Sequence, residues 1–239
     1  MNPWLLRDSR AQLQVGPLRG QVDLINPALG VNGLAWNNGS VAGNLFGVTV
    51  AQESIEPSNL SVVGLDKFVR GDDLVANYPQ TESQPFTLHI YWRLTKAEPQ
   101  LVILDAIVSL QTSLLECFPK VMLTTNLPAT EAWQVTGEGA PPSQIDSHHE
   151  TNKFAGILLR EAKRGWSYLE VTHPDDLGSW QVDPSSPFMI CRELGGEFQE
   201  KGVIRRVWQR TALVDSARDL EIAGELYRSF VTATPSLTV

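Results

Sequence analysis

Short alternating runs of hydrophobic and polar residues recur along most of the chain. They cover residues 11–16, 20–26, 46–52, 60–65, 73–78, 86–94, 100–112, 152–162, 166–173 and 202–214. Alternation with a period of two is typical of strands that bury one face. Turn residues fill the gaps and no helical pattern lies between the runs, which favours antiparallel pairing over βαβ units. The sequence therefore predicts an all-β, mainly antiparallel fold, either a β-sandwich or the larger supersandwich.

One segment near the C-terminus departs from this pattern. Residues 216–230 place apolar side chains on one helical stripe, formed by Leu220, Ala223, Leu226, Tyr227 and Phe230. Ser216 and Asp219 have the spacing of a capping box. We expect an amphipathic helix that covers a sandwich face or a sheet edge. Residues 26–44 and 129–152 are predicted to be long loops, and residues 1–239 a single domain.

Composition and charge exclude several classes of protein. The chain has 239 residues and a formal net charge of −8, which disfavours binding to nucleic acid or to an anionic membrane. No stretch has the length of a signal-peptide core or a membrane span. Cys117 and Cys191 are far apart and predict buried thiols rather than a disulfide. We therefore expect a soluble, cytoplasmic protein without a cofactor, while the oligomeric state is left open.

The stretch FTLHIYWRL, residues 86–94, carries two different faces. Its apolar residues alternate with Thr87, His89, Tyr91 and Arg93. The next run, residues 100–112, is expected to pair with it through a hairpin loop at 95–100. The register in which partner numbers sum to an even value seals one apolar face completely. It places Asp105 on the other face, opposite or diagonal to Tyr91 and His89.

Two interpretations of this polar face compete. In one, it is an amphipathic sheet face on which Asp105 pairs with His89 or Arg93. In the other, it is a concave surface that binds a saccharide, because sugar C–H faces stack on a ring such as Tyr91 while hydroxyls need hydrogen-bond partners. His89 and Asp105 would then also be the best candidates for an acid–base pair.

Two further segments, a predicted hairpin at 157–170 and a predicted strand at 202–214, carry aromatic residues beside charged ones. In 157–170 the sequence predicts pairing of Leu159 with Tyr168, and core packing explains Trp166 and Tyr168 on the face that also holds Glu170. In 202–214, Arg206, Trp208 and Arg210 share a face and form a second candidate patch for an anion or a sugar. Ion pairs with nearby carboxylates, including those of Glu193, Glu197 and Glu200, are the competing interpretation.

The sequence contains no strong motif for metal binding or catalysis. Asp146, His148 and Glu150 share a side of an extended segment and are the best metal candidates, although their spacing matches no zinc or calcium motif. His173, Asp175 and Asp176 are expected to form a turn. No nucleophile elbow, P-loop or dinucleotide fingerprint is present. We predict no metal and no cofactor site from these patterns.

Two blocks of sequence resemble a known group of proteins. VRGDDLVANYPQTESQPFTLHIYWR and EFQEKGVIRRVWQRTALV resemble an uncharacterised family of bacterial proteins. The succession of long antiparallel strands is similar to the supersandwich of galactose-mutarotase-like proteins. That architecture implies a link to carbohydrates, but it transfers no catalytic residue, because the flanking motifs of the histidine and glutamate used by sugar epimerases are not found here.

The sequence thus leads to three hypotheses. The first is a binding protein that holds a carbohydrate or a carbohydrate-like ligand on a concave sheet face, through His89, Tyr91, Arg93 and Asp105, with Arg206, Trp208 and Arg210 as the second patch. The second is a sugar-active enzyme, such as an epimerase, or a protein related to a lyase or hydrolase. The third is a protein-interaction module, which predicts an exposed apolar patch and no deep pocket.

Overall fold

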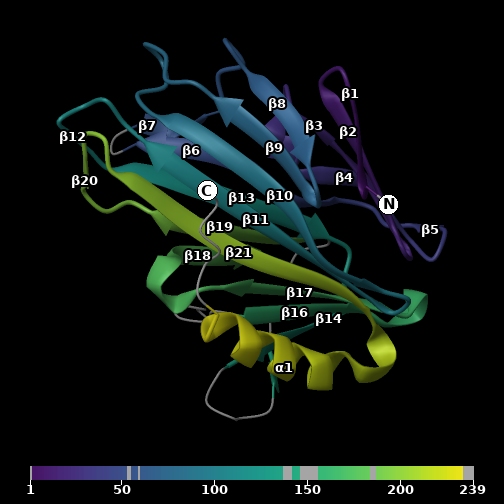
Figure 1. Cartoon of the computed structure of the whole chain (residues 1–239). Helices are drawn as coiled ribbons and strands as arrows, with labels where there is room; N and C mark the ends of the chain where they lie inside the picture. The colour runs from purple at the N-terminus through teal and green to yellow at the C-terminus, as the bar shows by residue number, and fades with distance from the viewer. Residues whose placement is uncertain are drawn as a thin grey trace.

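Two large antiparallel sheets pack face to face in the computed structural model (Figure 1). The structure describes residues 2–52, 55–58, 60–136, 142–145, 156–183 and 187–233. One sheet has ten strands, in the order β1-β2-β3-β4-β6-β13-β19-β18, with β5 beside β4 and β7 beside β6. The other has nine strands, in the order β15-β14-β16-β17-β21-β11-β10-β9-β8. The predicted mainly antiparallel, all-β sandwich is confirmed.

The strands of the two sheets range from two to twelve residues in length. The ten-stranded sheet contains β1 (Trp4–Arg7), β2 (Arg10–Val15), β3 (Leu18–Asp23), β4 (Val31–Trp36), β5 (Gly39–Ser40), β6 (Asn44–Gln52), β7 (Ile55–Ser58), β13 (Pro119–Leu127), β18 (Leu177–Asp183) and β19 (Phe188–Gly195). The nine-stranded sheet contains β8 (Asp66–Arg70), β9 (Asp73–Tyr78), β10 (Thr87–Glu98), β11 (Leu101–Gln111), β14 (Glu131–Val135), β15 (Ser143–Gln144), β16 (Gly156–Glu161), β17 (Trp166–Thr172) and β21 (Ile204–Asp215). A ribbon of β12 (Glu116–Cys117) and β20 (Gln199–Glu200) and the helix α1 (Asp219–Val231) complete the elements discussed below.

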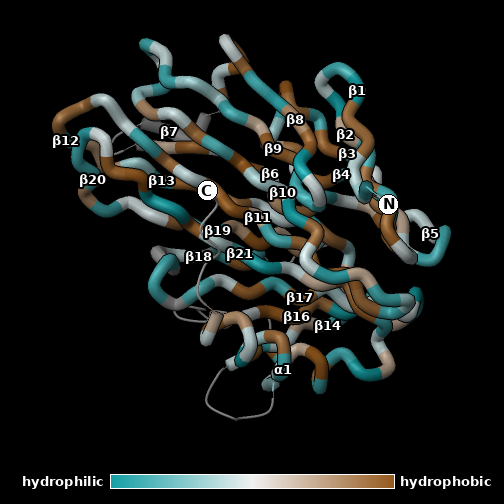
Figure 2. Tube along the Cα trace, in the orientation of Figure 1, coloured by the Kyte–Doolittle hydropathy of each residue, from teal (hydrophilic) through white to brown (hydrophobic). Residues whose placement is uncertain are grey.

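The main core lies between the two sheets. Alternate residues of the central strands point inward, and the large side chains of Phe46, Tyr78, Trp92 and Trp166 are buried there. Figure 2 shows the hydrophobic residues distributed along the strands of both sheets. Burial of such side chains contributes about 1.5–3 kcal/mol each, so this layer supplies most of the favourable free energy of folding.

A charged pair lies inside this core. Arg192 of β19 donates from Nε to Glu170 Oε1 of β17 at 2.5 Å, and both side chains are fully buried. The hydroxyl of Tyr168 donates to Glu170 at 2.7 Å and lies 3.1 Å from the hydroxyl of Thr125, on β13. Burial, and secondly the charge of Glu170, raise the pKa of Tyr168. These contacts connect the two sheets through polar groups at a point where the rest of the interface is apolar.

A second core lies on the outer face of the nine-stranded sheet, under α1. Ala223, Tyr227 and Phe230 of the helix are buried against this face, and the rings of Phe230 and Trp208 are 4.3 Å apart. The predicted helix and its apolar stripe are confirmed. The predicted capping box is wrong, because Arg218 occupies the N-cap position and Asp219 pairs with a sheet residue instead.

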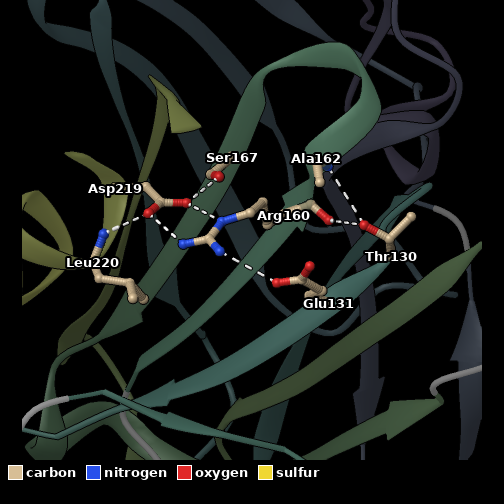
Figure 3. Close-up of polar contacts among 7 residues, drawn as sticks. All are labelled: Thr130, Glu131, Arg160, Ala162, Ser167, Asp219 and Leu220. Carbon is tan, nitrogen blue, oxygen red and sulfur yellow. Dashed lines mark hydrogen bonds and ion pairs between the residues drawn. The ribbon is translucent and has the colours of Figure 1, made fainter. Parts of the chain in front are cut away.

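That pairing docks the start of the helix onto the sheet (Figure 3). The buried carboxylate of Asp219 accepts two hydrogen bonds of 2.7 Å from the guanidinium of Arg160, on β16. Ser167 Oγ donates to the same carboxylate at 2.5 Å, and the guanidinium of Arg160 also lies 4.1 Å above the ring of Trp133. The helix is therefore held by a charge-assisted contact at one end and by aromatic packing at the other.

Several predicted boundaries are wrong. Residues 26–44, expected to be a loop, contain β4 and β5, and the other expected loop, 129–152, contains β14 and β15. Residues 60–65, expected to be a strand, precede β8 and are not in a strand. The hairpin loop expected at 95–100 is much shorter, because β10 continues to Glu98 and β11 begins at Leu101. In β4 the alternation is broken by Asn32 and Gly33, the latter with a φ of +59°, so the sequence there lacks the pattern that predicts a strand.

Candidate functional site

Three rows of side chains cross the outer face of the nine-stranded sheet, over β8, β9, β10, β11 and β21. The strand register sets these rows, because residues directly opposite one another point to the same face. The charge row consists of Arg70, Asp73, Arg93, Asp105 and Arg210. The aromatic row consists of Phe68, Val75, Tyr91, Ile107 and Trp208. The polar row consists of Asp66, Asn77, His89, Ser109 and Arg206.

The charge row is an alternating chain of ion pairs. The guanidinium of Arg93 binds the carboxylate of Asp73 through contacts of 2.7 and 2.9 Å. That of Arg210 binds Asp105 at 2.8 and 2.9 Å, and Thr95 also donates to Asp105 at 2.7 Å. Hydrogen bonding to Asp73 raises the pKa of Arg93 above its ordinary value. Both carboxylates are therefore engaged by the protein itself.

The aromatic row is covered at one end and open at the other. Trp208 is buried beneath Phe230 of α1, and the guanidinium of Arg210 lies 5.2 Å from the centre of its ring. At the far end Phe68 is 41% exposed, and Tyr91, between them, is half-buried. Figure 1 shows that α1 crosses the half of this face formed by β14, β16 and β17. We call the remaining part, with Phe68, Asn77, His89, Tyr91 and Arg93, the open half.

The open half contains polar groups that no described residue satisfies. Asn77 and His89 are directly opposite each other, and Tyr91 follows His89 on the same face. Within the described ranges, Asn77 Oδ1, the His89 ring and the Tyr91 hydroxyl have no hydrogen-bond partner in the protein. Partial burial lowers the pKa of His89. A neutral imidazole has one donor and one acceptor, so the three side chains together offer both kinds of group.

The lowered pKa of His89 gives the first prediction. We expect the titration midpoint of His89 to lie below 6.5, the ordinary value, because desolvation disfavours the charged ring. The unfolded chain then binds more protons than the folded one, so the free energy of unfolding decreases as the pH falls from 7 through the folded-state pKa. Titration of the histidine ring resonances by NMR, assigned with His89→Gln, measures this midpoint. A value at or above 6.5 would contradict the partial burial of the ring.

The structure brings the two predicted patches together. The register of β10 with β11 is the expected even one over residues 87–94, and β21 pairs with β11 on its other side. His89, Tyr91, Arg93, Asp105, Arg206, Trp208 and Arg210 therefore share one face. The sequence missed Asp73, Asn77 and Phe68, because only the pairing of the β8–β9 hairpin with β10 adds them to this face.

The expectations about individual contacts of these residues have different outcomes. His89 is opposite Ser109 whereas Asp105 is opposite Arg93, so the expected closeness of His89 and Asp105 is not found. The guanidinium of Arg210 lies over the ring of Trp208, and this ring is buried beneath α1, so Trp208 is not part of an exposed patch. The competing interpretation of the β21 arginines, ion pairs with carboxylates, is confirmed, since Arg210 binds Asp105 on β11 and Glu197, of the three upstream glutamates, binds Arg205 at 2.8 Å.

The weaker candidates fall outside this face. Asp146, His148 and Glu150 lie outside the described residues. Among the residues that are described, no cluster of three or more His, Cys, Asp or Glu side chains could hold a metal ion. Residues 174–176 form the expected turn, and Asp176 accepts a hydrogen bond from the backbone of Trp208 at 3.1 Å. Cys117 and Cys191 are both free, as expected, although Cys191 is only half-buried.

The surface also has an exposed apolar patch near the β12–β20 ribbon. Leu115 is 83% exposed and Phe198 is 50% exposed, and Val203 and Ile204 beside them are exposed as well. This patch is the feature that the protein-interaction hypothesis requires. In the parts of the chain described above, no helix has the length and hydrophobicity needed to cross a membrane.

Comparison with known proteins extends the fold assignment. No protein-family model matches the sequence, and no curated protein matches it. A "putative aldose 1-epimerase" from Klebsiella pneumoniae has a similar structure, with a TM-score of 0.52 and 6% identity over 97% of this chain and 87% of that one. The α-N-acetylgalactosaminidase NagBb from Bifidobacterium bifidum gives a TM-score of 0.49 at 11% identity, over 95% of this chain but only 38% of its own. The heparan sulfate lyase HepC from Pedobacter heparinus gives 0.43 at 8% identity, over 70% of this chain and 24% of the lyase.

These similarities concern the fold. The chain spans less than two fifths of the galactosaminidase and about a quarter of the lyase, and the identities are low. The similarity to the epimerase-like structure extends over nearly the whole of both chains, which agrees with the mutarotase-like architecture expected from the sequence. The protein thus has a β-sandwich fold similar to that of the epimerase-like structure, and its ligand has to be argued from its own residues.

Proposed function

We propose that this protein binds a carbohydrate or a carbohydrate-like ligand on the open half of the nine-stranded sheet. The observation that carries the proposal is the adjacency of the aromatic row to the polar row. Tyr91 and Phe68 offer ring surface, and the His89 ring and the Tyr91 hydroxyl offer hydrogen-bonding groups that the described protein does not use, beside Asn77, whose Oδ1 is buried. A saccharide needs both, since its C–H faces are apolar and its hydroxyls each donate and accept.

The charge row supports this surface in a different way. Because Asp73 and Asp105 hold Arg93 and Arg210 in fixed ion pairs, the row borders the open half with side chains whose positions are restrained. The remaining donors of such a guanidinium are directed by its planar geometry. This row serves as a rigid edge to the site rather than as a source of reactive carboxylates.

We favour binding over sugar chemistry at this face. An acid–base mechanism needs a histidine or carboxyl group with a second titratable group within reach. His89 lies between Asn77 and Ser109 in the register, and neither of these residues titrates. A catalytic role for His89 would therefore require an acid or base other than its two direct neighbours in the polar row.

Replacement of the central ring tests the proposal. Tyr91→Ala is expected to weaken saccharide binding about threefold to tenfold, because it removes both the ring and the hydroxyl. Phe198→Ala is the matched control, since Phe198 is an exposed aromatic residue on the β12–β20 side of the molecule. A ligand at 100 times its dissociation constant raises stability by about 2.7 kcal/mol, roughly 5–10 °C for a chain of this length.

A thermal-shift screen against neutral sugars, uronic acids and oligosaccharides finds the ligand, and titration calorimetry then compares the variants. Binding that is unchanged in Tyr91→Ala, or that falls equally in Phe198→Ala, would place the ligand elsewhere. Flat melting curves for every sugar at millimolar concentration would contradict carbohydrate binding itself.

A further inference from the structure

A groove lies at one end of the sandwich, away from the open half. Figure 1 shows β5 together with the β10–β11 and β16–β17 turns at the right-hand edge. Two depressions of about 580 and 550 Å³ adjoin there and share Asn37 as a lining residue. We call them together the end groove. It lies about 20 Å from Tyr91, since Glu98 on its wall is seven residues further along β10.

The β4–β5 turn places two amides in this groove. Asn37 and Asn38 have φ values of +48° and +65°, the left-handed conformation that a two-residue hairpin turn requires. Asparagine tolerates this conformation better than other residues with side chains. The turn therefore combines its structural requirement with two exposed amide side chains, each able to donate and accept hydrogen bonds.

Two arginines of the groove lack a carboxylate partner. Several arginines of the chain, such as Arg93, Arg160 and Arg210, are bound to carboxylates, although Arg7 and Arg228 also form no ion pair among the described residues. Within the described residues, Arg19 and Arg164, one in each depression, form no ion pair with a carboxylate. Arg164 makes one contact, from Nη1 to the backbone oxygen of Ser40 at 2.7 Å, which holds its guanidinium across the groove.

The inner wall of the groove is formed by two tryptophans. Trp36 is 4% exposed and Trp166 is 2% exposed, and both line the first depression. In the described part of the protein, neither indole N–H has a hydrogen-bond acceptor. Both N–H groups are themselves buried, as are those of Trp92 and Trp208 in the two cores, so the tryptophans contribute an apolar wall and no donor that a ligand reaches.

We infer that the end groove binds an acidic saccharide, one that carries carboxylate or sulfate groups beside its hydroxyls. Guanidinium groups bind such oxyanions through paired hydrogen bonds, and the amides of the turn suit the hydroxyls. The separation of Arg19 and Arg164 into adjoining depressions favours an oligosaccharide with more than one anionic residue. Glu98 also lines the groove and could repel an anionic ligand. Its carboxylate is bound to Lys96 at 2.8 Å, and the charge of Lys96 offsets this repulsion.

The test uses trigalacturonate as the acidic probe and maltotriose as the neutral one, with calorimetry on the full chain. Arg164→Ala and Arg19→Ala are each expected to weaken trigalacturonate binding about tenfold, and the double variant to abolish it at millimolar ligand. Asn37→Gly keeps the left-handed turn but removes the amide, and is expected to weaken binding severalfold. Arg228→Ala, an exposed cation on α1, is the charge-matched control and is expected to have no effect.

The calorimetric results either support or overturn the binding of an acidic saccharide in the end groove. A loss in the groove variants that spares Arg228→Ala and Tyr91→Ala supports a second site, whether or not the open half binds a sugar. Equal losses in Arg19→Ala, Arg164→Ala and Arg228→Ala would show attraction by net charge alone and would overturn the inference. It is also overturned if the wild-type protein does not bind trigalacturonate at 5–10 mM or binds maltotriose equally well.

Discussion

Arg192→Met is expected to lower the free energy of unfolding by about 3–5 kcal/mol, the largest effect among the substitutions considered for this protein. The guanidinium of Arg192 compensates the charge of Glu170 in the layer between the sheets, and both side chains are fully buried. Without it, an ionised carboxylate is left in a core where water does not replace the lost hydrogen bonds. Urea unfolding followed by tryptophan fluorescence measures the change.

The double variant Arg192→Met, Glu170→Leu separates charge from packing. Replacement of a whole buried ion pair by apolar residues of similar volume is often neutral. We therefore expect the double variant to regain much of the lost stability, although Tyr168 then keeps only the contact with Thr125. If the double variant is as unstable as Arg192→Met alone, the loss comes from packing and the buried charge is not its cause.

Asp219→Ala is expected to give the second-largest loss, about 2–3 kcal/mol. It removes the acceptor of two hydrogen bonds from Arg160 and one from Ser167, where the carboxylate itself is buried. The loss is smaller than for Arg192 because the Arg160 side chain is 20% exposed and keeps its contact with Glu131. Amide hydrogen exchange is expected to become faster in α1 and to stay unchanged in β11.

Glu221→Ala is the control for this prediction, since Glu221 forms an exposed ion pair with Arg218 in the same turn of chain. Such surface pairs contribute little to stability. If Glu221→Ala weakens the helix as much as Asp219→Ala does, general helix propensity and not the contact with the sheet holds α1 in place.

The hairpins were the most predictable part of this fold. In 86–112, alternation with one fully apolar face leaves a single satisfactory register, and the structure has it for Leu88 with Leu110. In 157–170 the four-residue loop sets the register, and the expected pairing of Leu159 with Tyr168 is found. The sequence could not place β4 or β14, since short strands interrupted by polar residues and glycine lack a continuous alternation. It also could not show how far β10 continues, because Thr95 to Glu98 form an exposed extension with no apolar pattern.

The sequence predicted which residues of β10 share the face of the candidate site. It did not predict which residues of other strands form ion pairs with them. Alternation placed His89, Tyr91 and Arg93 on one face, but which strand lies beside β10 on its other edge depends on the whole sheet order. For that reason the sequence did not predict that Asp73 of β9 binds the guanidinium of Arg93 while Asp105 binds that of Arg210. Glu170 shows the same limit in the core, since its partner Arg192 comes from the opposite sheet and no local pattern connects them.

The central claim is that a saccharide binds on the open half, and the tyrosine resonances test it most directly. The chain has four tyrosines, and Tyr78, Tyr168 and Tyr227 are buried whereas Tyr91 is half-exposed. In a protein with ring-labelled tyrosine, titration with the neutral saccharide that gives the largest thermal shift is expected to move the Tyr91 signal and leave the other three in place. Saturable binding that leaves the Tyr91 signal unchanged would contradict the claim.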